Sequence, residues 1–338
     1  MRRSLWLLPL LLVLAGCGDD CDSAPPPATT GLTVAQLNFL HGFSGECPQS
    51  ANCRLEERAD LLFDWIQARG CPDVVTLQEV WTTSLPLLLA RLDGACPFPY
   101  ALLQGSATFG VDDETVLSRY PATVMAQQPL FPGFRKVLFV RVEHPLGAVD
   151  VFTTHLASGS DGGPVPCGTS GCPAECLAAG ALVRRDCQAV QMAAFVAAQH
   201  DGLAPAVVTG DFNDEPGSFV YRQFTERGWD DVYLAAGNPE CNPASGVGCT
   251  SGREDEALDD LESPTSRESE RIDFIFLVPP GDGRACDLDT PADRDGDGTG
   301  TRLFAAEPNP FAADCGPAPA PICFPSDHVG VEMDLNCR

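Results

Sequence analysis

Six short segments of this 338-residue chain each end an apolar run with residues that could bind a metal ion or move a proton. The segments are Leu37–Phe39, Leu77–Val80, Thr153–Leu156, Gly210–Asn213, Arg271–Ile275 and Ser326–His328. Their candidate functional residues are Asn38, Glu79, His155, Asp211, Asn213, Asp273, Asp327 and His328. Because strand ends on a rigid scaffold can aim side chains at one point, the six segments together predict a single site.

The chemistry available to this set is hydrolysis of a phosphate ester. Carboxylate and amide oxygens suit a hard divalent cation such as Mg²⁺, which needs only one or two carboxylates because it keeps several waters. A cation and a protonated imidazole would offset the negative charge that grows on a phosphate attacked by water. A His–Asp pair transfers protons near neutral pH, so no Ser or Cys nucleophile is required.

Each residue taken singly also has an ordinary structural explanation. Asn38 and Glu79 could simply end strands, His155 could be a hydrogen-bonded buried histidine, and Asp273 could stabilise a loop. The occurrence of all of them, each after an apolar run, favours the functional interpretation.

Hydrophobic periodicity predicts the elements that position these residues. Helices are expected over 54–69, where an apolar stripe ends at Gly70, and over 182–199. Strands are expected over 32–39, 73–80, 115–118, 136–143, 148–154, 206–209, 272–278 and 329–335, and loops over 237–269 and 281–321. Alternating strands and helices, with some strand pairs close together, predict an α/β (α+β) fold of two packed sheets flanked by helices.

With Val116–Pro121, whose letters VLSRYP match a further motif, these segments resemble the endonuclease/exonuclease/phosphatase (DNase I-like) superfamily over residues 32–335. The resemblance implies a four-layer α/β/β/α sandwich. It implies a metal site in which Glu79 is the principal ligand, Asn38 binds metal or phosphate, and Asp327 contributes. The expected ion is Mg²⁺, with Mn²⁺ and Ca²⁺ as alternatives.

The resemblance also implies catalytic roles. Asp211 would orient or deprotonate the attacking water, and Asn213 would position that group or the phosphate. His328 would be the catalytic histidine, with Asp273 fixing its tautomer, and His155 would donate a hydrogen bond to a phosphoryl oxygen.

The N-terminus predicts export and a membrane anchor. A basic start and an apolar run over 5–14 precede Leu14-Ala15-Gly16-Cys17, which resembles a bacterial lipobox. This implies a signal peptide over 1–16, a lipidated Cys17, a tether over 17–31 and a catalytic domain over 32–338. The expected location is the bacterial cell envelope, at the periplasmic face or cell surface, with Gly18 favouring the outer membrane. The alternative is an ordinary secretory signal followed by a chance cysteine.

The chain has 16 cysteines, which suits a disulfide framework in an oxidising compartment. Cys167, Cys172, Cys176 and Cys187 are expected to staple one inserted loop. Apart from Cys17, 15 cysteines remain, so at least one is unpaired or intermolecular.

Charge and one acidic motif bear on ligands. The net charge of −26 argues against a broad basic footprint for nucleic acid. Asp293, Asp295 and Asp297 open like a calcium-binding loop, but Phe304 stands where a bidentate Glu is expected. A structural Ca²⁺ and a solvated acidic turn are both compatible with this motif.

The leading functional hypothesis is a phosphodiesterase that acts on phospholipid, in the manner of a sphingomyelinase, or on another small phosphodiester. The alternatives are an extracytoplasmic DNase I-like nuclease and a non-catalytic, calcium-stabilised surface binding module. The expected partners are the phosphodiester substrate and the membrane, and no obligate protein partner is evident.

Overall fold

The structure is a computed structural model, and it describes residues 31–40, 52–105, 113–159, 161–253, 258–278, 286–288 and 300–337. The predicted signal peptide, Cys17, the tether up to residue 30 and the candidate calcium residues Asp293, Asp295 and Asp297 lie outside the described residues. No helix within the described ranges is both long enough and apolar enough to cross a bilayer.

The first sheet, sheet A, contains seven strands: β1 (Leu32–Asn38), β2 (Val74–Val80), β3 (Ala101–Gln104), β4 (Asp113–Ser118), β11 (Cys286–Leu288), β12 (Arg302–Phe304) and β13 (Gly330–Cys337). Their order is β11-β13-β1-β2-β4-β3, and β12 also pairs with β13. Strands β1 and β2 are parallel, so Asn38 and the end of β2 lie at the same edge of the sheet.

The second sheet, sheet B, contains six strands: β5 (Ala122–Leu130), β6 (Arg135–His144), β7 (Gly147–His155), β8 (Ala206–Asp211), β9 (Asp230–Asp231) and β10 (Asp273–Val278). Their order is β5-β6-β7-β8-β10-β9. Strands β7 and β8 are parallel and place His155 opposite Asp211. Strand β10 is antiparallel to β8 and places Asp273 opposite Asp211.

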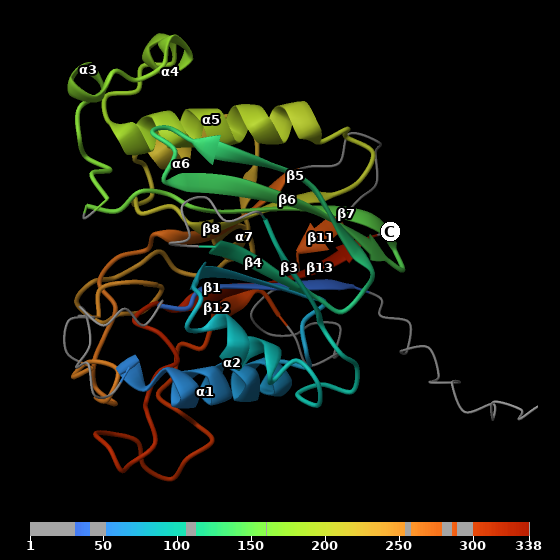
Figure 1. Cartoon of the computed structure of the whole chain (residues 1–338), viewed down its shortest axis with the longest axis vertical. Helices are drawn as coiled ribbons and strands as arrows, with labels where there is room; N and C mark the ends of the chain where they lie inside the picture. The colour runs from blue at the N-terminus through green and yellow to red at the C-terminus, as the bar shows by residue number, and fades with distance from the viewer. Residues whose placement is uncertain are drawn as a thin grey trace, which may run out of the picture.

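The helices cover the outer faces of the two sheets (Figure 1). Helices α1 (Leu55–Ala68) and α2 (Leu85–Leu89) lie against sheet A, and α5 (Arg184–Gln199) and α6 (Phe219–Thr225) lie against sheet B. The remaining helical turns are η1 (Asn52–Arg54), α3 (Cys167–Ser170), α4 (Ala174–Ala178) and α7 (Val232–Ala235).

Three hydrophobic clusters hold these layers together. The cluster beneath sheet A packs Ile66 of α1 against Leu37 and Val75, and the cluster above sheet B packs Met192 of α5 against Val208. A third cluster fills the space between the sheets with residues such as Val34, Val140 and Ile275. Because each sheet is covered on both faces, its strands are near-continuous apolar runs, and this explains why the sequence pattern predicted them.

The structure confirms the predicted four-layer α/β/β/α arrangement. The elements that were not predicted are strands β3, β5 and β9 and helices α2, α3, α4, α6 and α7, and the predicted loop over 281–321 contains the short strands β11 and β12. Strand β5 was missed because it is an exposed edge strand whose polar residues hide the alternation. Strands β11 and β12 are only three residues long, which is too short for a periodicity to be visible.

The described disulfides follow the cysteine pattern. Cys167–Cys172 and Cys176–Cys187 close the segment between β7 and α5, which confirms the prediction of one stapled insertion. The others are Cys71–Cys96, Cys241–Cys249 and Cys315–Cys323.

Candidate active site

The polar ends of β1, β2, β7 and β8 lie together at one edge of the two sheets. Asn38 Nδ2 donates to Glu79 Oε1 at 2.9 Å and to Asp211 Oδ2 at 3.0 Å, so it joins a carboxylate from each sheet. Its side-chain Oδ1 accepts from the backbone N–H of Leu40 at 3.1 Å. In this structure Asn38 therefore positions the two carboxylates, and its role as a metal ligand stays a prediction.

Two of the residues at this site have a left-handed backbone conformation. Glu79 has φ 59° and Asn213 has φ 52°, values that non-glycine residues seldom adopt. The Asn213 N–H donates to Asp211 Oδ1 at 2.8 Å, and its side chain donates to the Leu156 carbonyl at 2.8 Å. These bonds hold the left-handed turn after β8 and fix the Asp211 carboxylate, which is consistent with a positioning role for Asn213.

A buried His–Asp pair lies beside Asp211. His328 Nδ1 lies 2.9 Å from Asp273 Oδ2, and His328 Nε2 lies 3.8 Å from Asp211 Oδ2. Asp273 Oδ1 accepts from Gln36 Nε2 at 3.0 Å, and the backbone N–H of Asp273 donates to Thr250 Oγ1 at 3.1 Å. The carboxylate therefore has a fixed orientation, and it presents one oxygen to the imidazole.

The surroundings of His328 favour its protonated form. Burial opposes the charge, but the carboxylates of Asp273, Asp327 and Asp211 outweigh it and raise the pKa of His328 well above its usual value. With Nδ1 bonded to Asp273, the Nε2–H of the imidazolium is the proton that faces Asp211.

His155 approaches Asp211 from sheet B. Its Nε2 lies 3.4 Å from Asp211 Oδ2, and its Nδ1 lies 2.7 Å from Arg135 Nη1. Because a guanidinium is only a donor, Nδ1 must be the acceptor, so the proton of the neutral ring is on Nε2. Arg135 also forms an ion pair with Asp161. This tautomer gives His155 an N–H donor in the cleft, as its predicted phosphate-binding role requires.

Asp327 completes the group from the loop before β13. Its Oδ1 lies 3.1 Å from Ser326 Oγ, whose single hydroxyl proton also faces the Asn38 backbone carbonyl at 2.5 Å. Burial and the nearby Glu79 raise the pKa of Asp327, whereas His328 opposes this effect. Asp327 and Glu79 therefore lie within electrostatic range of each other.

The chemistry of these donors fits a hard divalent cation. Glu79, Asp211 and Asp327 bring three carboxylates to one cleft, and the fully buried Arg58 lies near two of them. Arg58 donates to the carbonyls of Cys53, Phe39, Pro325 and Leu40, so its hydrogen bonds go to the backbone. The negative charge that remains is the charge that a Mg²⁺-like ion would offset through oxygen ligands.

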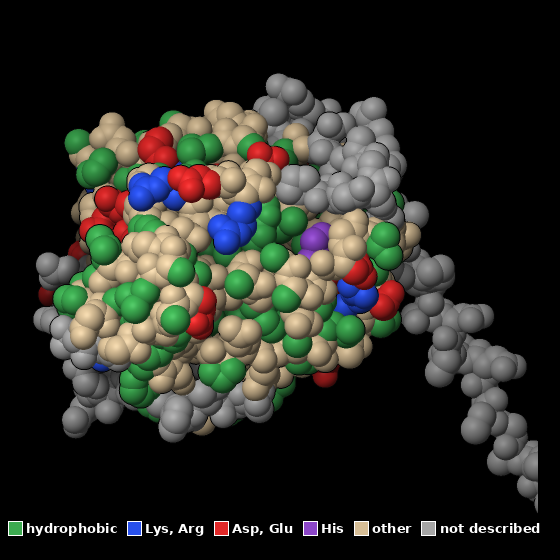
Figure 2. All heavy atoms as spheres, turned by 90° about the horizontal axis from the view of Figure 1, so that it is seen from above, with side chains coloured by type: hydrophobic (Ala, Val, Ile, Leu, Met, Phe, Trp, Pro, Cys, Tyr) green, Lys and Arg blue, Asp and Glu red, His purple; other side chains and the backbone are tan. Residues whose placement is uncertain are grey.

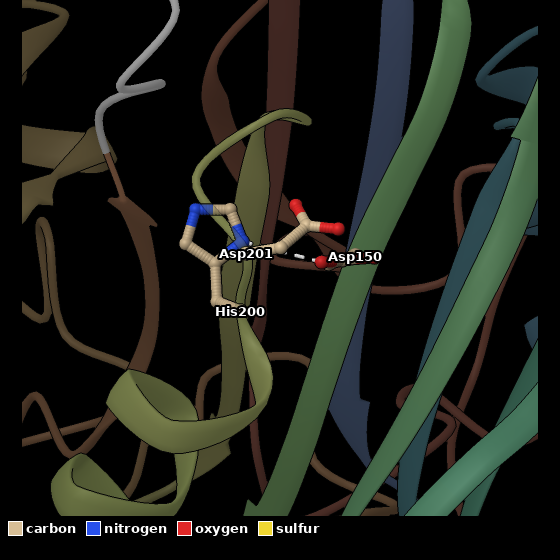
Figure 3. A group of neighbouring side chains, drawn as sticks. All are labelled: Asp150, His200 and Asp201. Atoms are coloured by element: carbon tan, nitrogen blue, oxygen red, sulfur yellow. Dashed lines mark hydrogen bonds and ion pairs between the residues drawn. The ribbon is translucent and has the colours of Figure 1, made fainter.

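A second His–Asp cluster lies elsewhere, at Asp150, His200 and Asp201 (Figure 3). His200 Nδ1 faces Asp150 Oδ2 at 3.2 Å. Arg141 already contacts both carboxylates, Asp150 through Nε at 2.7 Å and Asp201 through Nη2 at 3.3 Å. Because a guanidinium occupies this position, the cluster is an ion-pair network, and a metal ion there would be repelled.

Some supporting residues were not predicted. Gln36 lies two positions before Asn38 on the same face of β1, so strand periodicity could have identified it. Arg135 begins β6 and reaches His155 across the sheet, a contact for which a single sequence carries no signal. Arg58 reads as one polar position of an amphipathic helix, and its burial depends on the loops that fold over it.

The two packed sheets and their covering helices define a DNase I-like fold. An endonuclease/exonuclease/phosphatase from Bacteroides vulgatus superposes with TM-score 0.60 and 17% identity, covering 92% of this chain and 100% of that chain. TDP2 of D. rerio, solved with a single-strand DNA product, superposes with TM-score 0.58 and 18% identity, covering 91% of this chain and 100% of that chain. A mannosyl-6-phosphatase from Bacteroides thetaiotaomicron superposes with TM-score 0.57 and 16% identity, covering 90% of this chain and 99% of that chain.

At these identities the three structures show the fold alone. Residues 35–328 match the model of the Endonuclease/Exonuclease/phosphatase family, and the chain belongs to that family. Enzymes of this family hydrolyse phosphoesters and use divalent metal ions. Among curated protein sequences, none matches the chain.

Proposed function

We propose that this protein is a metal-dependent hydrolase of small phosphodiesters, phospholipid headgroup esters among them, which acts by in-line attack of water. The observation that carries the proposal is the Asp211–His328–Asp273 arrangement beside Glu79. His328 Nε2 lies 3.8 Å from Asp211 and its Nδ1 lies 2.9 Å from Asp273.

Each side chain has a part in the proposed reaction. Glu79 and Asp327 would hold the divalent ion, which when bound supplies positive charge to the phosphoryl oxygens. Asp211 orients the water and accepts its proton, because its Oδ1 is fixed by Asn213 and its Oδ2 faces both histidines. His328, kept protonated by its carboxylate neighbours, and the Nε2–H of His155 donate to oxygens that become more negative in the transition state.

Charge supports a small substrate over duplex DNA. The chain has 47 acidic and 21 basic residues. On the face seen in Figure 2, the coloured side chains of the described residues include basic groups only in isolated positions. A duplex-binding protein needs a row of phosphate contacts. The alternative nuclease function has one argument in its favour, since TDP2 of D. rerio was solved with a DNA product on the same fold.

We further propose that the chain is exported and anchored by lipid at Cys17 to the bacterial cell envelope. The support is the basic start, the short apolar run and the lipobox-like Leu14-Ala15-Gly16-Cys17. An anchor would hold the cleft near lipid substrates and raise their local concentration.

The proposal is tested by a substrate panel with the full chain. Sphingomyelin, phosphatidylcholine, bis(p-nitrophenyl) phosphate, mannose 6-phosphate and plasmid DNA are each incubated with Mg²⁺, with EDTA, and with EDTA followed by excess Mg²⁺ or Mn²⁺. We expect hydrolysis of one or more of the small diesters, loss with EDTA and recovery with metal. Asp211→Asn should reduce kcat by about 10²–10⁴-fold, since it removes the proposed proton acceptor.

The other outcomes overturn parts of the proposal. Hydrolysis of DNA alone would establish the nuclease, and hydrolysis of mannose 6-phosphate alone would establish a monoesterase. Hydrolysis that persists in EDTA would refute the metal requirement. No hydrolysis of any phosphoester would favour the non-catalytic binding module.

A further inference from the structure

A cavity of about 450 Å³ lies next to the segment that carries Asp327 and His328, since Val329 lines it and Arg253 of its lining donates to the Ser326 carbonyl. Its walls include Trp65 and Arg69 at the C-terminal end of α1, Tyr233 of α7, and Arg302 and Leu303 of β12. Turns near residues 245–249 and 266–268 form the opposite wall. None of the eight residues proposed for the catalytic site lines this cavity.

Positive charge is concentrated in this cavity. Arg69, Arg253, Arg267 and Arg302 all line it, which is four of the 21 basic residues in a chain of net charge −26. The Nε atoms of Arg69 and Arg302 each lie 3.4 Å from the same Oε2 atom of Glu332. One buried carboxylate thus faces two guanidinium groups.

This sharing leaves repulsion between the two arginines. Burial lowers the pKa of Arg69, the carboxylates of Glu332 and Glu307 oppose this, and the neighbouring Arg302 lowers it further. A second anion close to both guanidinium groups would relieve that repulsion.

The other charged residues on the lining are Arg253, Arg267, Glu268 and Glu307. Arg253 is paired with Glu268 at 2.5 Å, whereas the exposed Arg267 has no ion pair within the part of the chain that the structure describes. Among the described residues that line the cavity, Glu268 and Glu307 carry negative charge.

One buried donor on the lining lacks an acceptor. The indole Nε1 of Trp65 is buried and has no hydrogen-bond acceptor among the described residues, whereas the Nε of Arg69 faces Glu332 Oε2 at 3.4 Å. Trp65 as a whole is 5% exposed. Buried donors of this kind are unfavourable unless a ligand or water accepts from them, so the cavity offers hydrogen bonds as well as charge.

We propose that this cavity binds a small organic anion. Its carboxylate or phosphate group accepts hydrogen bonds from Arg69 and Arg302, and its apolar ring lies against Trp65 and Tyr233. Guanidinium groups bind such oxyanions through paired N–H donors, and the volume is within the usual range for small-molecule sites. Binding here requires neither the catalytic metal nor turnover, so this proposal stands independently of the proposed function.

The test is isothermal titration calorimetry of the full chain in EDTA. Phenylphosphonate and benzoate represent the two acidic groups, and benzyl alcohol is the neutral analogue. We expect saturable binding of at least one anion and none of the alcohol. Arg302→Gln leaves Glu332 paired with Arg69, and Arg267→Gln changes an exposed side chain. Arg302→Gln should weaken binding about tenfold or more, the effect of one lost charge-assisted hydrogen bond. Arg267→Gln removes a charge from the lining without a proposed hydrogen bond, so it should weaken binding by a smaller factor.

Arg222→Gln is the matched control, because Arg222 is an exposed arginine on α6 that contacts Glu226 at 3.6 Å. It should bind the anion as the wild type does, and circular dichroism should show that all three variants are folded. Binding of phenylphosphonate alone identifies a phosphate site, and binding of benzoate alone identifies a carboxylate site. The proposal is overturned if neither anion binds, if benzyl alcohol binds equally, or if Arg267→Gln and Arg302→Gln both bind as the wild type does.

Discussion

Replacement of Asp273 by asparagine tests the role of the buried His–Asp pair. The Asp273 Oδ1 atom accepts from Gln36 Nε2 at 3.0 Å, and an asparagine would keep that bond with its carbonyl oxygen. Its NH₂ group would then stand where Oδ2 now lies, 2.9 Å from His328 Nδ1. Because an amide nitrogen only donates, Nδ1 would have to accept and the ring would become neutral.

The expected loss of activity follows from this geometry. A hydrogen bond to a charged partner contributes about 1.5–3 kcal/mol, which is roughly 10- to 150-fold in rate if it acts fully in the transition state. The neutral ring also ceases to be a good proton donor, so we expect kcat to fall by about 10²–10⁴-fold in total. Since Asp273 helps to raise the pKa of His328, the limb of the pH profile that reports loss of its proton should move to lower pH.

The chain supplies its own control. Asp150 is also a fully buried aspartate, and its Oδ2 lies 3.2 Å from Nδ1 of His200. It forms an ion pair with Arg141 and is not one of the proposed catalytic residues. Asp273→Asn and Asp150→Asn are compared by hydrolysis of bis(p-nitrophenyl) phosphate across pH, at a temperature where thermal unfolding shows both to be folded. Asp150→Asn should keep the wild-type kcat and pH profile.

Two results would refute the reasoning. Wild-type kcat in Asp273→Asn would mean that the pair has no part in proton transfer. An equal decrease in both variants would mean that loss of a buried carboxylate, wherever it lies, explains the effect.

Three further predictions concern metal, pH and a disulfide. Glu79→Gln should raise the Mn²⁺ concentration needed for half-maximal activity about tenfold or more, measured by metal titration, because it removes the charge of the proposed main ligand; an unchanged titration curve would reject that role. Burial raises the pKa of Glu268 to about 7, so the folded state binds its proton more tightly than the unfolded state does and loses stability as pH rises from 4.5 through 7. Between pH 4 and pH 8 the free energy of unfolding, measured with urea, should decrease by about 3 kcal/mol less in Glu268→Gln than in the wild type. An identical decrease in both proteins would contradict this. The Cys71–Cys96 disulfide closes 25 residues, so replacing both cysteines by alanine should lower the free energy of unfolding by about 3 kcal/mol, and a loss below 1 kcal/mol would argue against it.

Much of the fold could be predicted because its determinants are local. The strands that end in Asn38, Glu79 and Asp211 are buried apolar runs, and Gly70 ends α1 with a φ of 73° that suits glycine. The pattern predicted two packed sheets flanked by helices, and the family resemblance carried by the polar strand ends implied the four-layer sandwich.

The contacts that fix the side chains could not be predicted, because they join residues far apart in the sequence. Asn38 lies between carboxylates from both sheets only once the sheets pack, and Arg135 meets His155 only through the β6–β7 register. The cavity lined by Trp65 and Tyr233 depends in the same way on long-range contacts. Arg69 and Arg302 are far apart in the chain, yet both contact the carboxylate of Glu332. Such pairings depend on topology, which local patterns do not encode.

The central claim is that the polar strand ends of the two sheets, with Glu79 among them, hold one divalent cation. It is tested most directly by a crystal structure of the protein soaked in Mn²⁺, with anomalous scattering recorded to locate the ion. We predict one strong peak, within about 2.0–2.3 Å of a Glu79 carboxylate oxygen. A cleft without a peak, or a single peak at Asp150, His200 and Asp201, would contradict the account.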